Sequence, residues 1–527
     1  MKIVQMLRTT RSITIGIYGG SKDIYRPAEP LRVRLHTGVI KEVDRMIMTF
    51  YQLQPDTEYQ FELLDQSEHC TDRLTVSTRY EFVTLNVRDF GARGNGLAND
   101  TLAIQAAIQA CPAESRVLIP KGDYLITTLF LKSHIHIEIE REAHLVAETS
   151  RDEFPLFPGM IESYDEKTEL NLGTWEGNPL PMYTGIITGY DVEDVILYGE
   201  GCIDGRASYE NWWQDAKKMR GAFRPRMLFL SHCRDISVEG LTFCNSPSWT
   251  IHPYFSEHLR FYHVDIQNPE DSPNTDGIDP ESCEHVEIAG CHITLGDDCI
   301  AVKSGKIYMG QKYKKAAKDI HIWQCLMENG HGAVTLGSEL AAGIYGVHVE
   351  KCLFQNTDRG LRIKTRRGRG NLAVVDEVCF EQIVMDQVKT PFVVNAFYCC
   401  DPDGRTDYVQ NRNALPVDER TPLIQQLVFR NITCYHVHAA AGYFYGLAEQ
   451  PICKIELKDI YVDYANQAKP FMPAMLCGEQ EMCRQGFIFR NINSVCLKQV
   501  SIVGVDGEAV TAENVKLLEN KEIEVLT

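Results

Sequence analysis

Apolar and polar residues alternate along most of this chain in a way that predicts strands. From residue 236 onward one unit recurs: apolar, any, apolar, two residues, apolar, any, and usually a further apolar position. Such a unit buries its apolar face only by stacking on its neighbours, so we predict a right-handed parallel β-helix, with an ordinary β-sandwich of chance periodicity as the alternative. The units begin at Ile236, Leu259, Val286, Ile320, Val347, Val378, Leu427, Ile455 and Phe487.

One stretch instead has apolar residues at helical spacing, TLAIQAAIQACP (101–112). Asn99 or Asp100 is suitably placed to cap the start of this helix, and Pro112 to end it. We expect the helix to cover the N-terminal end of the solenoid, where unpaired strand edges would otherwise invite aggregation. After it the pattern predicts strands, with no second helix.

Residues 1–85 differ from the rest. Short alternating segments at 12–19 and 59–65 predict half-buried strands. Between them, LQPDTEY (53–59) resembles the tyrosine corner of fibronectin type III domains, in which a Tyr hydroxyl bonds back to nearby backbone; a generic hairpin turn is the alternative. We therefore predict an all-β protein with a small fibronectin type III-like β-sandwich at 1–85 and the parallel β-helix at 86–527.

Composition narrows the possible partners. The net charge of −19 argues against nucleic acid and against anionic membrane surfaces. The 18 cysteines are scattered without a CxxC pair, so we expect reduced thiols, many of them in the core, and neither a metal site nor a cofactor. Arg8 and Arg11 interrupt the apolar stretch that a signal peptide would need, so we expect a cytoplasmic protein. Solenoids of this kind are often monomers, so we also expect a monomer.

Three aspartates carry the candidate chemistry. Asp276 lies in SPNTDGIDPESC (272–283), and Asp297 and Asp298 lie in LGDDCIAVKSG (295–305). Hydrolysis of a glycosidic bond needs one carboxylic acid to protonate the leaving oxygen and one carboxylate to activate a water. A carboxylate cluster supplies both, because like charges at close range raise the pKa of at least one member. The alternative is a structural role, since Asn-Thr-Asp-Gly is good turn chemistry.

The repeat predicts which of these residues converge. Asp297 and His331 each lie 11 residues after the first apolar position of their own unit. Equal phase places them on adjacent coils, about 4.8 Å apart. Asp276 and Arg362 lie 17 and 15 residues after theirs, which is compatible with the same face.

Four short motifs, taken together and in this order, resemble those of glycoside hydrolase family 28, the polygalacturonases. The flanking segments RPRMLFL (224–230) and NSPSWTIHP (245–253) are also similar, and the resemblance covers roughly 86–510. One departure is Gly296, where many endo-acting members have Gln before the two aspartates. The motifs are NTD (274–276), DD (297–298), GHG (330–332) and RIK (362–364).

The resemblance implies an inverting hydrolase that needs no metal and cleaves α-1,4-galacturonosidic bonds in polygalacturonate or oligogalacturonates. By that resemblance, Asp297 is the general acid. Asp276 and Asp298 hold the attacking water. His331 lies beside the acid and tunes its protonation or orientation.

The resemblance also implies that Arg362 and Lys364 bind the sugar carboxylate. Arg offers a planar fork for two hydrogen bonds, and Lys adds a point charge. Lys303 lies near the motifs and Asn274 is the first residue of the NTD motif, and we expect both to line the cleft as further substrate-binding residues. The other three arginines of RIKTRRGRG (362–370) are expected to be solvated.

We favour exo action, because a fibronectin-like front end is shared with a subset of exo-acting members. Long polar stretches at 154–181 and 401–422 are also predicted to form loops that close one end of the cleft. Three alternatives stay open. They are a rhamnogalacturonan or xylogalacturonan hydrolase, a calcium-dependent β-helical pectate lyase, and a non-catalytic carbohydrate-binding solenoid. The RIK segment argues against rhamnogalacturonan, and the full aspartate set argues against binding alone.

Overall fold

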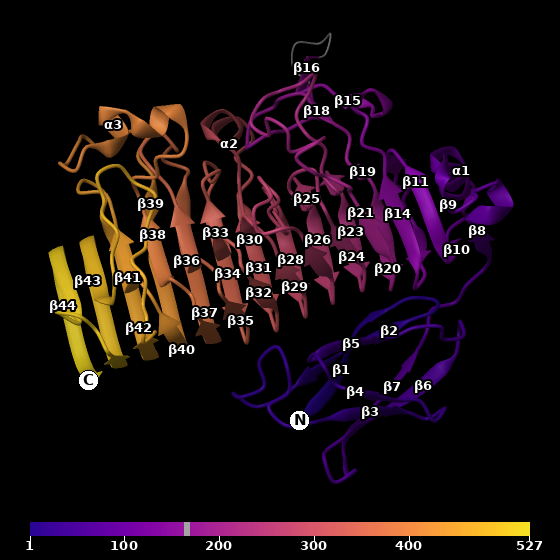
Figure 1. Ribbon diagram of the computed structural model, residues 1–527, viewed down its shortest axis with the longest axis horizontal. Coiled ribbons are helices and arrows are strands. Elements are labelled where there is room, and N and C mark those ends of the chain that lie inside the picture. The colour runs from indigo at the N-terminus through magenta and orange to yellow at the C-terminus, as the bar shows by residue number, and fades with distance from the viewer. Residues whose placement is uncertain (163–168, 527) are drawn as a thin grey trace.

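A parallel β-helix makes up most of the protein in the computed structural model, which describes residues 1–162 and 169–526. Its strands lie side by side from the N-terminal helix to the last strand of the chain, and a small sandwich lies against one side (Figure 1). The fold is all-β, as predicted. Inward-facing side chains of successive coils form one continuous apolar core.

Each coil contributes strands to three parallel stacks. The first stack contains β8 (Thr84–Asn86), β10 (Arg116–Ile119), β13 (Ile135–Ile139), β20 (Glu193–Gly199), β23 (Arg234–Glu239), β26 (Glu257–Tyr262), β28 (Glu284–Ala289), β31 (Ala317–Trp323) and β34 (Ile344–Glu350). The second contains β9 (Asn95–Asn99), β11 (Gly122–Ile126), β14 (Ala143–Ala147), β21 (Cys202–Asp204), β24 (Thr242–Cys244), β27 (Asp265–Gln267), β29 (His292–Thr294), β32 (Leu326–Glu328) and β35 (Leu353–Gln355).

The third stack carries the loops at the upper edge of Figure 1. It contains β12 (Leu129–Phe130), β19 (Ile187–Tyr190), β22 (Leu228–Ser231), β25 (Ile251–Tyr254), β30 (Asp298–Val302), β33 (Gly332–Gly337), β36 (Arg359–Lys364), β38 (Thr390–Asn395) and β41 (Ala440–Tyr445). In the last coils, single long strands run through more than one stack: β37 (Val374–Asp386), β40 (Gln426–Val437), β42 (Ile452–Tyr464), β43 (Gln485–Val503) and β44 (Val510–Leu526), with β39 (Leu423–Ile424) paired to β37.

The register confirms the predicted repeat with one correction. The first eight predicted positions, from Ile236 to Ile455, pair directly from coil to coil in the first stack. The partner of Ile455 in the next coil is Val495. Phe487, predicted as the ninth position, instead pairs with Gly442 in the third stack. The long strand β43 has the same alternation throughout, so the pattern alone does not distinguish its two halves.

The predicted N-terminal helix is α1 (Thr101–Ala110), and Cys111, just before Pro112, is its C-cap. Asn99 accepts a hydrogen bond from the Thr101 amide, whereas the carboxylate of Asp100 accepts from the amides of residues 93 and 94. The helix packs at the end of the solenoid beside β10 and β12, as expected.

The expectation of no second helix is wrong, because α2 (Ile307–Tyr313) and α3 (Asp407–Gln410) are present. The seven-residue α2 has no side-chain cap at its start, and Gly310 lies within it, so local signals for a helix are weak. Tertiary contacts hold it instead: Met309 is buried in a satellite core, and Lys312 and Tyr313 bind Glu169. The described part of the chain also contains three 3₁₀ turns, η1 (Val87–Phe90), η2 (Arg151–Glu153) and η3 (Pro402–Arg405).

The predicted 154–181 loop carries two short antiparallel ribbons, and its residues 163–168 lie outside the described residues. The ribbons are β15 (Leu156–Phe157) with β18 (Met182–Tyr183), and β16 (Met160–Glu162) with β17 (Glu169–Asn171).

The N-terminal region forms two antiparallel sheets around a core of its own. The Tyr59 hydroxyl accepts a hydrogen bond from the Gln54 amide at 2.8 Å, the contact expected of a tyrosine corner. This contact favours the fibronectin type III-like interpretation. One sheet holds β1 (Lys2–Arg8), β2 (Ile13–Tyr18) and β5 (Ile47–Phe50); the other holds β3 (Arg32–Leu35), β4 (Ile40–Glu42), β6 (Glu58–Leu64) and β7 (Cys70–Ser77).

The sandwich packs on the outer face of the first stack, away from the loops of the third stack. Leu7 and Ile47 contribute to a shared apolar cluster there, and Arg45 forms an ion pair with Asp265 at 2.7 Å. Within the ranges the structure describes, no helix has the length and apolar character needed to cross a membrane.

Candidate active site

Adjacent strands of the third stack bring the sequence motifs together. Asp298 pairs in register with Gly332, and the His331 amide donates to the Asp297 carbonyl at 2.8 Å. The equal phase predicted for Asp297 and His331 is therefore confirmed. Asp276 lies on the preceding coil, where the Gly277 amide donates to the Asp298 carbonyl at 3.0 Å.

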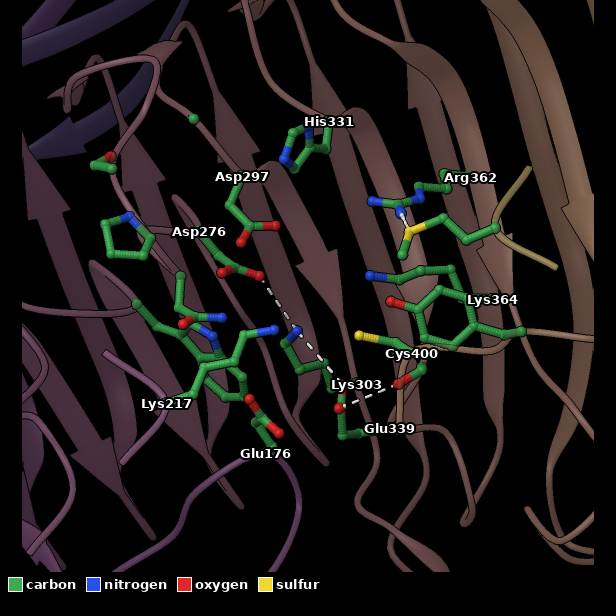
Figure 2. A pocket seen from close by; sticks show the side chains of 18 of the residues that line it. Glu176, Lys217, Asp276, Asp297, Lys303, His331, Glu339, Arg362, Lys364 and Cys400 are labelled. Carbon is green, nitrogen blue, oxygen red and sulfur yellow. Dashed lines mark hydrogen bonds and ion pairs between the residues drawn. The ribbon is translucent and has the colours of Figure 1, made fainter. Parts of the chain in front are cut away.

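These residues surround a cavity of about 450 Å³. Asp276 and Asp297 point into it from one side, and Arg362 and Lys364 approach it from the opposite side (Figure 2). His331, Lys303 and Asn274 also line it. Asp298 is fully buried and is not among the lining residues of the cavity.

Asp276 and Asp297 form a carboxylate pair, with oxygens within 4.8 Å of each other. Burial and the charge of Asp297 raise the pKa of Asp276 to about 7, against the opposing effect of Lys303. Like charges this close do not both ionise readily, so the pair retains one proton near neutrality. Asp297 is the more exposed of the two, and its Oδ1 accepts a hydrogen bond from the Asp298 amide at 3.0 Å.

Asp298 is held between two cations. Its Oδ1 accepts from Arg362 at 2.8 Å and its Oδ2 accepts from Lys364 at 2.7 Å. Burial alone would raise the pKa of Asp298, but Lys364 and Arg362 outweigh burial and hold it well below its usual range. The trio of Asp298, Arg362 and Lys364 therefore carries one net positive charge at the cavity wall.

Gly332 leaves room for this trio. A Cβ at residue 332 would lie 2.3 Å from Thr335 Oγ1, 2.9 Å from Asp298 Oδ1 and 3.3 Å from Arg362 Cδ. Because Arg362 aligns with Thr335, farther along the coil, its side chain must reach back across the glycine to meet Asp298. The second position of glycine in the GHG motif therefore requires glycine on steric grounds.

Lys303 is only 2% exposed, although it borders the cavity. Its Nζ lies 3.5 Å from Asp276, 3.7 Å from Asp279 and 3.6 Å from Glu339. Burial lowers the pKa of Lys303, but these carboxylates raise it well above its usual value. The Lys303 ammonium also lies over the Trp249 ring, 4.2 Å from its centroid. These contacts hold Lys303 in place beside Asp276 at the cavity wall.

Asn274 borders the cavity with its amide oxygen already bonded. Arg224 donates to Asn274 Oδ1 at 2.8 Å and to the Pro273 carbonyl at 2.9 Å. Asn274 adopts a left-handed backbone conformation with φ of 55°. The arginine therefore fixes the turn that positions Asp276.

His331 is hydrogen-bonded to a residue that the sequence analysis missed. Its Nδ1 lies 2.9 Å from Asp358 Oδ2, and this bond raises the pKa of His331. Lys389 in turn lies 2.6 Å from the other oxygen of Asp358. Asp358 and Lys389 each lie 11 residues after the first apolar position of their own unit, so the phase rule could have found both.

The expectation that the remaining arginines of RIKTRRGRG are solvated is wrong. Arg366, Arg367 and Arg369 are 1%, 1% and 3% exposed. Arg366 and Arg369 donate to Asp401 at 2.9 and 3.3 Å, and Arg367 donates to Glu449 at 2.8 Å. The segment after β38 folds back over them, and sequence alone gives no sign of that path.

Segments distant in sequence close the cavity. Glu176 comes from the 154–181 stretch, Asp401 from the segment after β38, and Met475 from the connection between β42 and β43. Met475 Sδ lies 3.1 Å from Arg362 Nη2. None of these three was predicted as a site residue, because each belongs to a connection without a motif.

Gly296, the departure noted in the sequence, faces another of these segments. A Cβ at residue 296 would lie 2.2 Å from the Glu270 carbonyl oxygen. No side chain fits there, so residues 269–271 occupy the place that a Gln side chain would need. Glu270 and Asp271 line the cavity on that side.

Oxygens of Asp276, Asp297 and Asp298 lie within 4.8 Å of one another, close enough to surround a cation. Asp298 already has two cationic partners and Asp276 has Lys303 nearby. The positive charge that a metal would bring is therefore largely supplied by the chain itself.

The sequence of this chain is similar to those of known proteins. The family model described as glycosyl hydrolases family 28 matches residues 111–477. A Vitis vinifera protein described as "Probable polygalacturonase" is 31% identical over 390 residues, covering 72% of this chain and 74% of its own.

Solved structures extend the likeness in fold. A family 28 exopolygalacturonase of Yersinia enterocolitica aligns with TM-score 0.73 and 17% identity, covering 98% of this chain and 97% of its own. A hyperthermoactive exopolygalacturonase of Thermotoga maritima aligns with TM-score 0.61 and 23% identity, covering 78% and 91%. The Yersinia alignment is long enough to include the N-terminal sandwich.

Proposed function

Because the chain belongs to glycosyl hydrolases family 28, we propose that it hydrolyses α-1,4-galacturonosidic bonds in polygalacturonate or oligogalacturonates. One observation carries this proposal. A carboxylate pair that retains a proton, Asp276 with Asp297, faces a trio of one net positive charge across a cavity (Figure 2). The pair suits cleavage of a glycosidic bond, and the trio suits a substrate whose sugars each carry a carboxylate.

We assign the proton donor to Asp297, the more accessible member of the pair. When the shared proton is on Asp297, Asp276 is ionised, so it orients the attacking water and accepts a proton from it while Asp297 protonates the leaving oxygen. The His331 amide fixes the backbone of Asp297 by its hydrogen bond. The His331 side chain, bonded to Asp358, contributes to the electric field at the Asp297 carboxylate. Arg362 and Lys364 bind the carboxylate of the sugar, and Asp298 keeps both of them in place from below.

Inversion is part of the proposal, although the carboxylate spacing alone does not favour it. The oxygens lie within 4.8 Å, whereas most inverting enzymes separate their carboxyl groups by about 6.5–9.5 Å. A retaining enzyme, however, needs an unencumbered carboxylate nucleophile. Asp298 is fully buried with both oxygens bonded to cations, and Asp276 is buried beside Lys303, so neither is suited to direct attack.

The walls of the cavity support exo action as part of the proposal. Residues 269–271 close it beside Gly296, and segments carrying Glu176, Asp401 and Met475 border it elsewhere. A long polysaccharide binds through its middle only along an open groove, whereas a walled cavity accepts a chain end.

The test is digestion of a defined oligogalacturonate series, with products sized over time and the first anomer observed by NMR. Steady release of one small product and a β-anomer from the α-linked substrate are expected. A spread of product sizes would contradict exo action, and an initial α-anomer would contradict inversion. An unsaturated product that absorbs in the ultraviolet, formed only without chelator, would instead identify a calcium-dependent lyase.

The pH dependence should follow the shared proton. With the pKa of Asp276 raised to about 7, the pair is singly protonated below that pH and loses its proton above it. We expect kcat/KM to fall about tenfold per pH unit above pH 7. Between about pH 4 and 7 the folded state keeps a proton that the unfolded chain has lost, so this group's contribution to stability declines as pH rises.

Measurement of kcat/KM from pH 4 to 9 checks this, with denaturant unfolding at each pH to separate loss of activity from loss of fold. A profile that stays flat from pH 7 to 9 in folded protein would show that the shared proton is not needed.

A further inference from the structure

A row of imidazole, thiol and carboxylate side chains lies on the outer face of the first stack. Residues alternate in and out along β31, β34 and β37, and the outward ones align from coil to coil. His321 pairs with His348, and His348 pairs with Cys379. At the next outward-facing position, two residues along the strands, Glu350 pairs with Glu381.

These side chains lie close enough to share an ion. One ligand atom from each of His321, His348 and Glu350 lies within 4.8 Å of the other two, and the same holds for His348, Cys379 and Glu381. His321 Nε2 is 3.0 Å from Glu350 Oε1, so the imidazole and the carboxylate already face each other. All five are partly exposed, so an ion can reach them from solvent.

We propose that His321, His348 and Glu350 bind one borderline transition-metal cation of the Zn²⁺ class. Two imidazoles and a carboxylate are the ligands such an ion favours, with water completing a tetrahedral site. The two imidazole rings are stacked with centroids 5.2 Å apart and an interplanar angle of 6°. Both rings are partly exposed, so their nitrogens are free to turn toward a shared ion.

His348 is the shared member of both sets, so Cys379 and Glu381 offer an adjacent position for the same ion. A thiolate strengthens the preference for Zn²⁺ over Mg²⁺ or Ca²⁺, which favour oxygen ligands. This site is independent of the proposed hydrolysis, because it lies on the outer face of the first stack and the cavity is built on the third.

The site also adjoins the contact between the solenoid and the sandwich. Trp323, beside His321, stacks on Tyr18 at 5.1 Å. Lys351, next to Glu350, donates to the Gly19 carbonyl at 3.2 Å. A bound ion would therefore join adjacent coils at the surface on which the end of β2 packs, and should raise the melting temperature.

The chain offers a matched control on the same stack. His258 and His285 are also stacked, with centroids 4.7 Å apart, and His285 is bonded to Asp319. Within the described residues these three do not form a group of ligand atoms close enough to hold an ion. His258→Ala therefore removes a similar exposed imidazole without touching the proposed site.

The experiment is isothermal titration calorimetry of ZnCl₂ into full-length protein freed of metal by EDTA and desalting. We expect about one site per chain, at least tenfold weaker binding in His348→Ala and in the isosteric Glu350→Gln, and unchanged binding in His258→Ala. MgCl₂ should give no comparable binding. Circular dichroism and unchanged hydrolysis of oligogalacturonate establish that each variant is folded.

Three results would overturn the proposal. The first is the absence of saturable Zn²⁺ binding by the folded wild-type protein, and the second is equal binding by wild type and His348→Ala. The third is loss of binding in Asp297→Asn, which would place the ion among the cavity carboxylates instead. A rise in melting temperature with ZnCl₂ that EDTA reverses, present in His258→Ala and absent in His348→Ala, is the supporting outcome.

Discussion

Asp297→Asn is expected to lower kcat by about 10²–10⁴-fold while leaving KM within a few-fold of wild type. The range is that of a lost general acid, since an amide cannot deliver a proton to the leaving oxygen. The substitution keeps the shape of the side chain, and its amide oxygen can still accept from the Asp298 backbone. Steady-state kinetics on oligogalacturonate give kcat and KM, and calorimetry gives the affinity of the variant for uncleaved substrate.

Asp319→Asn is the control, because it makes the same change of charge at an exposed side chain outside the cavity. It should retain full activity. A fully active Asp297→Asn would remove the general acid from this position. A variant that loses affinity and turnover together would assign Asp297 to substrate binding rather than proton transfer.

The sequence predicts the solenoid well because each repeat of its apolar pattern corresponds to one packed coil. Each coil buries the same alternating positions, so Leu259 and Val286 occupy equivalent places and pair in register. The repeat fails to distinguish the stacks only in the last coils, where one strand runs through several of them. There Phe487 satisfies the pattern while belonging to a different stack from Ile455.

The same phase rule predicts part of the site. It places His331 beside Asp297, and it would have placed Asp358 and Lys389 on the next coils had it been extended. These are positions on regular strands or directly before them. The rule therefore predicts neighbours along a stack, but not which neighbours form ion pairs.

Connections between strands account for what could not be predicted. The buried state of Arg367 depends on Glu449, which lies 82 residues farther along the chain. Met475 reaches Arg362 from a connection with no repeat at all. Such contacts depend on the path of irregular backbone, which leaves no periodic signal in the sequence.

Lys364→Met is expected to affect substrate binding and stability together. With Lys364 removed, Asp298 and Arg362 neutralise one another and no net charge remains for the sugar carboxylate. A charge-assisted hydrogen bond contributes about 1.5–3 kcal/mol, so KM should rise about 10–150-fold. Asp298, fully buried, also loses one of its two cations, and breaking a buried pair costs about 3–5 kcal/mol of unfolding free energy.

The pH dependence of this stability has a definite sign. Because the folded pKa of Asp298 lies below its usual range, the stabilisation is complete above about pH 4 and is lost as pH falls further toward the folded pKa. In Lys364→Met that acid-sensitive contribution should shrink. Urea unfolding from pH 2 to 7 measures it in both proteins.

Arg367→Met is the matched comparison, since Arg367 and Glu449 form another ion pair with side chains only 1% and 4% exposed, away from the cavity lining. It should lose similar stability while KM stays near wild type. If both variants raise KM equally, the effect of Lys364 reflects general loosening of the coils. If Lys364→Met alone raises KM, the trio binds the substrate carboxylate, and Asp298 is the residue that fixes its geometry from beneath the cavity.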